Sequence, residues 1–304
     1  MKLTNKYYLA YIYLIIATSL WAGNILAAKI AHSIMLEPIK LSFYRNIITI
    51  LILLPFAIRK LIQNYKIYLK NYKIIILLSI LSVSVFNTFL NISLTSSSVI
   101  SSSIFPAFAP SLIILITFIL YKVKIKFIQS IGVSISFIGF IIIVLRGDYQ
   151  NLSKLNFVTG DLWMSCAVIS WALYSVILKK IPKNFDTIVF LFLIFFIGNI
   201  IIIPFFIVES DYINLFVRDK FSWLIIFYVG IGPALISYLL WIKSIKIIGA
   251  SKSGLFLNLI PIFSALISIV FLNETIKLFH IIGALLIFLG IYIVSKEKLD
   301  EKNY

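Results

Sequence analysis

The sequence predicts an all-α integral membrane protein, with ten transmembrane helices arranged as two inverted five-helix repeats. Of its 304 residues, 62% are hydrophobic and 12% are charged, whereas soluble domains are about 45–50% apolar and about 25% charged. The apolar residues fall into segments that are long enough to cross a bilayer, which takes about 20 residues per helix. A second version of the C-terminal pair of segments also occurs half a chain length earlier.

Ten segments are apolar throughout, and we expect each of them to cross the membrane once. They span residues 7–28, 39–58, 73–92, 98–121, 125–145, 161–180, 186–207, 221–243, 249–272 and 278–295. The longest connections, residues 59–72 and 146–160, are too short to fold as separate domains. We therefore expect any chemistry to take place inside the helical bundle.

The internal repeat relates residues 1–148 to residues 149–304. Aligning residues 249–294 with residues 98–144 pairs Pro110 with Pro261, Gly132 with Gly283, and Gly139 with Gly290. Upstream, a shift that is one residue shorter pairs Trp21 with Trp171. Because each half holds an odd number of helices, the second half enters the membrane from the opposite side and the repeat is inverted. Inverted repeats are typical of secondary transporters, whose substrate site lies near mid-membrane between the two halves.

The formal net charge of +16 follows the expected topology. With a cytoplasmic N-terminus, ten crossings place most lysines and arginines on the cytoplasmic side. The other face receives Lys29, Lys40, Arg146, Lys154, Arg218, Lys220 and Lys277. Cytoplasmic loops of membrane proteins carry such an excess, so the charge does not indicate a nucleic-acid partner. We expect a multi-pass protein of the inner (plasma) membrane with both termini in the cytoplasm.

The first segment carries Trp21 and Asn24, which lie one helical turn apart on a similar face. A membrane tryptophan is commonly an interface anchor, but Trp21 lies deep in its segment, so lining of a cavity is an equal alternative. For Asn24, substrate binding competes with a hydrogen bond between helices.

Arg45, in the segment 39–58, is the only arginine well inside an apolar segment. Charges at such depth are costly and usually face the bundle interior or a water-filled cavity. Three roles are open for Arg45: binding of an anionic group, structural pairing, and snorkelling of the guanidinium to the membrane interface.

Six further side chains on four segments are candidates for lining the same cavity. They are Asn87, Trp171, Tyr174, Tyr238, Trp241 and Asn258. Aromatic residues with polar tips form an apolar pocket with a few hydrogen-bonding groups, which is the usual composition of small-molecule sites. Ordinary packing is the alternative for each of them.

Prolines occur at matching places in the fourth and ninth segments. Pro106 and Pro110 lie in the fourth segment, and Pro261 lies in the ninth. Because proline removes a backbone donor and kinks a helix, we expect paired helix bends that take part in gating around the central site.

The acidic residues all fall in expected loops, tails or helix ends, and His32 and His280 also lie near helix ends. Proton-driven carriers usually hold a carboxylate or a histidine inside the membrane. The pattern therefore favours facilitated transport or exchange. The sequence contains no pattern typical of a metal site, an ATP-binding loop or a catalytic triad, and we expect no enzymatic activity, no cofactor and no metal ion.

The order and spacing of these motifs resemble the EamA-like branch of the drug/metabolite transporter superfamily. The resemblance rests on TSLWAGN with Lys29, on EPIKLSFYRN and on the stretch 249–293. Pro261, Glu274, Gly283 and Gly290 match the family's ninth and tenth helices. In the first half, Val123 stands where a counterpart of Glu274 is expected.

The resemblance implies a monomeric or homodimeric carrier that moves a small metabolite, most often an amino acid or a related compound, by alternating access. It also implies a central cavity lined by helices one, three, four, six, eight and nine. Its partners would be the small-molecule substrate and the lipid bilayer. The competing interpretations are a membrane-embedded enzyme or lipid-handling protein on the same bundle, and a passive channel, which would need a continuous polar stripe.

Overall fold

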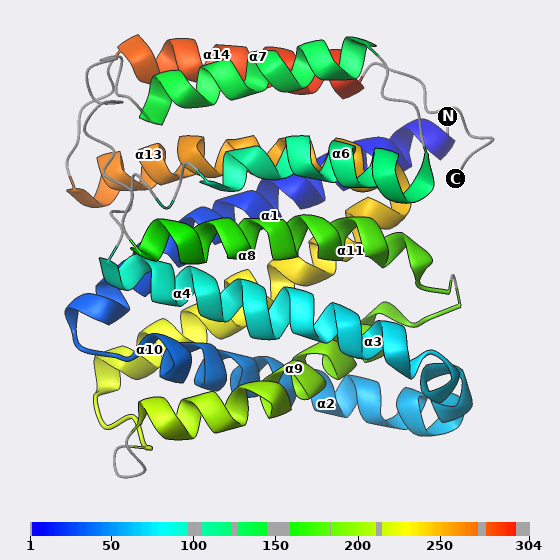
Figure 1. Ribbon diagram of the computed structural model, residues 1–304, viewed down its shortest axis with the longest axis vertical. Coiled ribbons are helices and arrows are strands. Elements are labelled where there is room, and N and C mark those ends of the chain that lie inside the picture. The colour runs from blue at the N-terminus through cyan, green and yellow to red at the C-terminus, as the bar shows by residue number, and fades with distance from the viewer. Residues whose placement is uncertain are drawn as a thin grey trace.

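The computed structural model describes residues 2–96, 102, 105–122, 127–144, 159–182, 184–210, 215–272 and 278–295. These residues form a bundle of helices that run roughly along one common direction, and no β-strand occurs among them (Figure 1). The helix α1 begins, and α14 ends, at the same end of the bundle.

The first half of the chain begins with two long helices and continues with shorter pieces. The elements are α1 (Lys2–Ser33), α2 (Pro38–Lys70), α3 (Tyr72–Ser79), the π-helix η1 (Ile80–Val85), α4 (Phe86–Ser96), the 3₁₀-helix η2 (Phe105–Phe108), α6 (Ala109–Tyr121) and α7 (Phe127–Val144).

The second half repeats this order of long, π-interrupted and 3₁₀-interrupted helices. Its elements are α8 (Thr159–Ile177), the 3₁₀-helix η4 (Leu178–Lys180), α9 (Thr187–Glu209), α10 (Lys220–Val229), the π-helix η5 (Gly230–Ile236), α11 (Ser237–Ile248), α12 (Ala250–Leu255), the 3₁₀-helix η6 (Phe256–Leu259), α13 (Ile260–Leu272) and α14 (Leu278–Ser295).

Several of the described helices are long and apolar enough to span a bilayer. They are Lys6–Ser33, Pro38–Lys70, Tyr72–Ser96, Leu162–Lys180, Thr187–Glu209 and Lys220–Ile248. Shorter apolar helices cover Leu112–Tyr121, Phe127–Gly139 and Ile281–Val294. The fold is thus that of a multi-pass membrane protein, and the count of ten crossings stays a prediction.

The expected connection at residues 59–72 is wrong, because α2 continues to Lys70 with one non-helical residue at Asn64. The extension is held by Tyr68, which is buried and accepts a hydrogen bond from the backbone N–H of Asp186. Its ring packs against that of Phe185 in a tilted arrangement, with the ring centroids 4.7 Å apart. The charged residues of this stretch suggested a loop, but one face of it packs against the start of α9.

Glycines of α7 and α14 lie in the contact between these two helices. A Cβ atom on Gly139 would lie 2.6 Å from the carbonyl oxygen of Gly283, and one on Gly132 would lie 2.9 Å from that of Gly290. Small residues allow such a close approach of two helix backbones. Because Gly132 matches Gly283 and Gly139 matches Gly290 in the repeat, the contact is the same when the two helices are exchanged.

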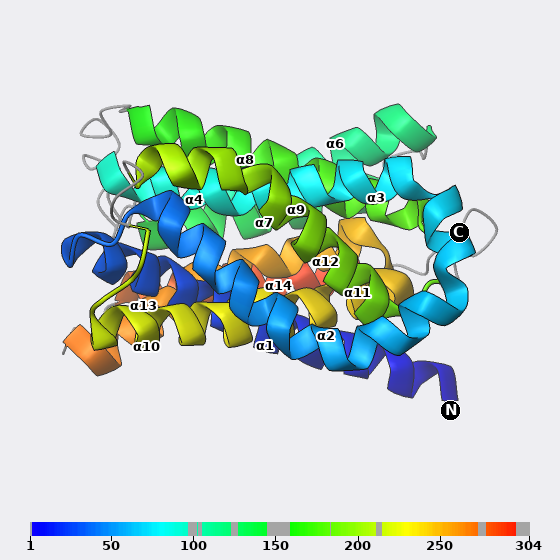
Figure 2. The ribbon, with the colours of Figure 1, turned by 90° about the horizontal axis from the view of Figure 1, so that it is seen from below.

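The other helix pairs have the same reciprocal character. The helix α1 packs against α11 and α13, and the matching helix α8 packs against α4 and α6. The helices α2 and α9, which also match in the repeat, lie side by side at one edge of the bundle (Figure 2). Each half therefore buries its apolar faces mainly against the other half.

The matching prolines lie where helices are interrupted. Pro106 lies in η2, Pro110 is in the first turn of α6, and Pro261 is the second residue of α13, directly after η6. Proline is well tolerated in a first helical turn because its missing N–H would have no partner there. Both interruptions are thus short 3₁₀ turns followed by a new helix, and a gating role for them stays a prediction.

Replacing Gly139 by leucine tests the contact between α7 and α14. We expect Gly139→Leu to lower the free energy of unfolding by about 1–3 kcal/mol, because the larger side chain overpacks a tight interface. Unfolding of the purified protein in mixed detergent micelles, followed by tryptophan fluorescence, measures the change. The control is Ser134→Leu on the exposed face of α7. Equal effects of the two substitutions would contradict the assigned contact.

Candidate functional site

A cavity lies between the two halves, and it is lined by residues of α1, α2, α4, η2, α6, α8, η6 and α13. The lining residues are Trp21, Asn24, Ile25, Arg45, Phe86, Asn87, Leu90, Pro106, Ala109, Val168, Trp171, Leu257 and Ile260. The centres of water molecules can reach about 40 Å³ of this space, which is room for a few waters. A larger ligand therefore needs the walls to move apart.

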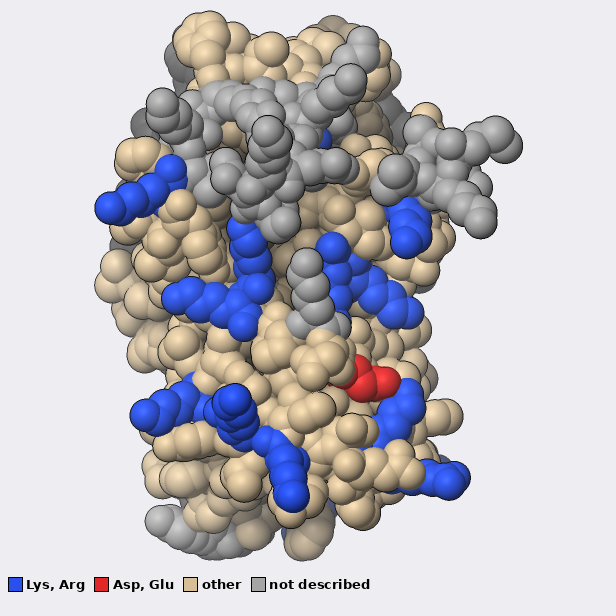
Figure 3. Space-filling model, turned by 90° about the vertical axis from the view of Figure 1, so that its right-hand side faces the viewer, with Lys and Arg blue, Asp and Glu red and all other residues tan. Residues whose placement is uncertain are grey.

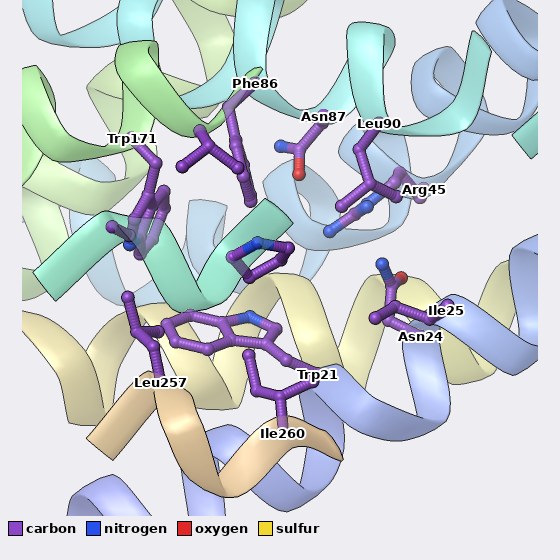
Figure 4. A pocket seen from close by; sticks show the side chains of 13 residues that line it. Trp21, Asn24, Ile25, Arg45, Phe86, Asn87, Leu90, Trp171, Leu257 and Ile260 are labelled. Carbon is purple, nitrogen blue, oxygen red and sulfur yellow. The ribbon is translucent and has the colours of Figure 1, made fainter. Parts of the chain in front are cut away.

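The cavity has a polar end and an aromatic end (Figure 4). The side chains of Asn24, Arg45 and Asn87 lie together on one side, and the rings of Trp21 and Trp171 lie on the other. Apolar residues from η6 and α13 close the aromatic end from below in this view. This distribution suits a small amphipathic molecule.

Trp21 lines the cavity and is not an interface anchor, because it is only 8% exposed and lies at the centre of the bundle. Its indole Nε1 donates a hydrogen bond of 3.1 Å to the carbonyl oxygen of Pro233 in η5. Its ring meets that of Trp171 edge to face, with the centroids 5.1 Å apart. The two tryptophans that match in the repeat thus touch each other at the cavity wall.

Tyr238 and Trp241 of α11 are fully buried and stand one layer behind the lining residues. The Tyr238 hydroxyl donates to the carbonyl oxygen of Ser82 in η1 at 2.6 Å and accepts from Asn87 Nδ2 at 3.2 Å. The Trp241 ring packs 5.3 Å from that of Trp21. Both residues position the wall without reaching the cavity in this conformation.

Tyr174 and Asn258 are also buried and do not line the cavity. The ring of Tyr174 lies 5.2 Å from that of Trp171. Asn258 belongs to η6, and its Oδ1 has no hydrogen-bond partner in the part of the chain that the structure describes. Of the prolines, only Pro106 is among the lining residues.

Asn87 is held by hydrogen bonds from its own amide group. Its Nδ2 donates to the carbonyl oxygen of Ser82 at 3.2 Å and to the Tyr238 hydroxyl. Its Oδ1 points toward the cavity (Figure 4). A ligand would therefore meet an acceptor at this position.

Arg45 neither snorkels to the interface nor forms an ion pair within the described residues. It is 1% exposed, and its Nε and Nη1 atoms have no hydrogen-bond partner there. The described salt bridges join Lys40 to Glu37 and Lys60 to Asp186. Two of the three roles considered for Arg45 are thereby excluded in the described part of the molecule.

The family model of the EamA-like transporter family matches the chain twice, over residues 8–145 and 158–296. The two matches cover nearly the whole chain. This protein belongs to the EamA-like transporter family. It is accordingly a permease of the drug/metabolite transporter superfamily, and a multi-pass membrane protein.

Curated relatives of this EamA-like protein include several that are named as uncharacterized transporters. The chain is 28% identical over 226 residues to an uncharacterized transporter, YyaM, of Bacillus subtilis, and the match covers 74% of this chain and 74% of the relative. It is 23% identical over 289 residues to an uncharacterized transporter of Clostridium kluyveri, which covers 92% of this chain and 91% of the relative. A solved crystal structure matches 96% of this chain and 97% of its own with a TM-score of 0.74 at 15% identity, which shows a shared fold.

Sequence reasoning missed part of the lining of this EamA-like protein. Phe86, Leu90, Leu257 and Ile260 are apolar residues in apolar segments, so no local signal distinguishes them from residues that face lipid. The expected lining by the eighth helix is not observed in this conformation, and the second helix contributes Arg45 instead. Glu274, which the family resemblance singled out, lies outside the described residues.

Removing the Trp21 hydrogen bond tests the link between α1 and η5 in this EamA-like protein. We expect Trp21→Phe to destabilise the fold by about 1–3 kcal/mol, because the buried Pro233 carbonyl oxygen loses its donor. Unfolding in mixed detergent micelles measures this loss. The matched control is Trp163→Phe in α8, whose indole is 36% exposed. A loss at Trp21 no larger than that at Trp163 would count against the assigned role.

Proposed function

We propose that the protein is a secondary transporter that moves a small metabolite, an amino acid or a related compound, across the cytoplasmic membrane by alternating access, in export or exchange. The observation that carries this proposal is the cavity between the two halves, with its polar end and its aromatic end. Such a cavity is concave, mostly apolar and equipped with a few polar groups, as small-molecule sites are.

Ten crossings in two inverted repeats belong to the same proposal. The double match of the family model supports it, as do the reciprocal helix pairs and the symmetric glycine contact. Residues that match in the repeat also meet at the centre, because Trp21 touches Trp171. Asn87 likewise hydrogen-bonds Tyr238, which lies 151 residues later, as Pro261 does after Pro110. Contacts between equivalent positions are expected along a pseudo-twofold axis.

Alternating access requires segments that can change conformation while the rest of each half moves as a unit. The π-helices η1 and η5 and the 3₁₀-helices η2 and η6 are such segments, because short non-α stretches within helices often mark hinges. All four lie at or directly behind the cavity walls. We infer that they carry the bending that opens the cavity to one side and then to the other.

The enzyme and lipid-handling interpretations gain no support from the lining of the cavity. The described residues that line it include no aspartate, glutamate, histidine, cysteine or serine, so these residues supply no general acid, general base or nucleophile of the common kinds.

The orientation that we propose places both termini in the cytoplasm. Figure 3 views the end of the bundle at which α1 begins and at which α2, α8 and α11 end, and lysines and arginines scattered over this face far outnumber aspartates and glutamates among the residues drawn in colour. An excess of basic residues on one face is typical of the cytoplasmic side.

Counterflow in proteoliposomes tests the transport function. We expect vesicles loaded with one class of unlabelled metabolite to take up the labelled compound of that class, with or without a pH gradient. The panel comprises amino acids, the corresponding 2-oxo acids and nucleotides. Strict dependence on the gradient would contradict gradient-independent exchange, and no counterflow of any compound would contradict the proposed function.

Shortening one side chain that lines the cavity provides a variant for the same counterflow assay. We expect Trp171→Ala to reduce counterflow by about 2- to 10-fold, because aromatic contacts contribute about 0.5–1.5 kcal/mol each. Trp163→Ala, in the same helix but outside the cavity, is the control. Unchanged counterflow in Trp171→Ala at equal protein levels would remove this residue from the site.

Labelling of single cysteines tests the topology. In a Cys166→Ala background, we expect Phe216→Cys to react with a membrane-impermeant maleimide added outside the cell, and Lys66→Cys to react only after the membrane is opened. Both positions are exposed. Phe216 follows the seventh proposed crossing and is therefore expected outside the cell, whereas Lys66 follows the second and is expected in the cytoplasm. The reverse pattern would overturn the proposed orientation.

A further inference from the structure

We propose that Arg45 binds the anionic group of the transported compound, and hence that the substrate is a small organic anion with an apolar body. The anionic group is a carboxylate or a phosphate. This inference rests on the proposed transport function and names the chemical class of its substrate.

Arg45 carries a charge that is buried and unpaired within the described residues. The Arg45 side chain is 1% exposed, and its Nε and Nη1 atoms have no partner within the described residues. Guanidinium groups remain protonated in proteins, and a buried charge is retained only where something compensates it. Because neither snorkelling nor an ion pair compensates Arg45 in this part of the chain, a ligand with a negative charge is the remaining partner.

The guanidinium group of Arg45 lies at the cavity. Arg45 lines the cavity and its terminal nitrogens point into it, beside the side chain of Asn24 (Figure 4). A guanidinium matches the two oxygens of a carboxylate or a phosphate with parallel hydrogen bonds. Trp171, whose Nε1 is also buried without a partner in the described structure, stands at the opposite, aromatic end. The polar groups without partners around this cavity are thus mainly donors.

The end of the cavity opposite Arg45 is apolar. Trp21, Phe86, Trp171, Leu257 and Ile260 face the cavity there with rings and aliphatic groups. They suit the apolar body of an organic acid. The small space between them excludes bulky compounds from this conformation.

The charge balance of the cavity separates acids from amines. Arg45 is the one ionisable side chain among the lining residues in the part of the chain that the structure describes. An ammonium group would meet no carboxylate there, and only the Oδ1 of Asn87 and the aromatic faces would receive it. We therefore expect an acid without an ammonium group to bind more tightly than the corresponding zwitterion, and an amine to bind least.

The same balance favours exchange over net transport. When an anion is bound, the net charge of the site is close to zero in the closed state. Without an anion, the charge of Arg45 would be buried alone. The loaded carrier should therefore change conformation faster than the unloaded one. Efflux of an anionic substrate is then accelerated by anion on the opposite side of the membrane.

The experiment compares four probes that share one aromatic body: phenylacetate, phenyl phosphate, the neutral phenylacetamide and the cationic phenethylamine. Their binding to the full-length protein in nanodiscs is followed by tryptophan fluorescence, because two tryptophans line the cavity. We expect at least one anion to bind on the order of tenfold more tightly than phenylacetamide, as a charge-assisted hydrogen bond implies. Phenylacetate and phenyl phosphate separate the two sources of negative charge.

The variants assign the effect to Arg45. We expect Arg45→Gln to abolish the preference for the anion, and Arg45→Lys to keep part of it, because lysine retains the charge but not the planar fork. The matched control is Arg59→Gln, which removes the same charge from an exposed position of the same helix. An unchanged preference in Arg45→Gln would overturn the inference.

The comparison of the four probes in the wild-type protein does not depend on whether any variant folds. If neither anion bound more tightly than phenylacetamide, the inference would be wrong. Counterflow of neutral or cationic metabolites without counterflow of anions would also refute it, while leaving the transport function intact. Tight anion binding without counterflow of any metabolite would support the role of Arg45 and contradict the transport function.

Discussion

The constraint on which the structure depends is that every backbone carbonyl buried in the bundle needs a hydrogen-bond donor, because lipid supplies none. The π-helices η1 and η5 leave carbonyl groups outside the regular helical pattern, and the opposite half of the molecule supplies their donors. The hydroxyl of Tyr238 binds the carbonyl oxygen of Ser82 in η1. The indole of Trp21 and the hydroxyl of Thr49 bind carbonyl oxygens of η5. The irregular segments therefore join the two halves at the level of the cavity.

This exchange of donors explains why the site is built from aromatic residues with polar tips. Trp21 uses its indole N–H for η5 and leaves its ring to the cavity and to Trp171. Tyr238 uses its hydroxyl for η1 and thereby holds Asn87 at the polar end. A movement that separates the halves must replace these bonds together, so opening and closing are coupled to the geometry of the site.

The charges at the helix ends differ from the charge at the cavity. Glu209 accepts hydrogen bonds from two backbone N–H groups at the start of α2. Burial raises the pKa of Asp186, but the Lys60 ammonium and two N–H groups of α9 outweigh it and hold that pKa below its ordinary value. These groups have partners within the described chain, whereas the Nε and Nη1 atoms of Arg45 have none there. The contrast distinguishes a structural charge from one that awaits a ligand.

The sequence by itself determined the membrane class, the positions of most helices, the matched prolines and glycines, and Arg45 as the charge in an apolar segment. These features are local, because hydropathy, helix breaking and the cost of a buried charge depend on a residue and its near neighbours. Only the tertiary structure decided that Trp21 lines the cavity, that Tyr238 stands behind it, and that α2 extends past residue 58. Those outcomes depend on partners contributed by the other half of the chain. The sequence around a residue does not specify which distant group will pack against it or form its hydrogen bond.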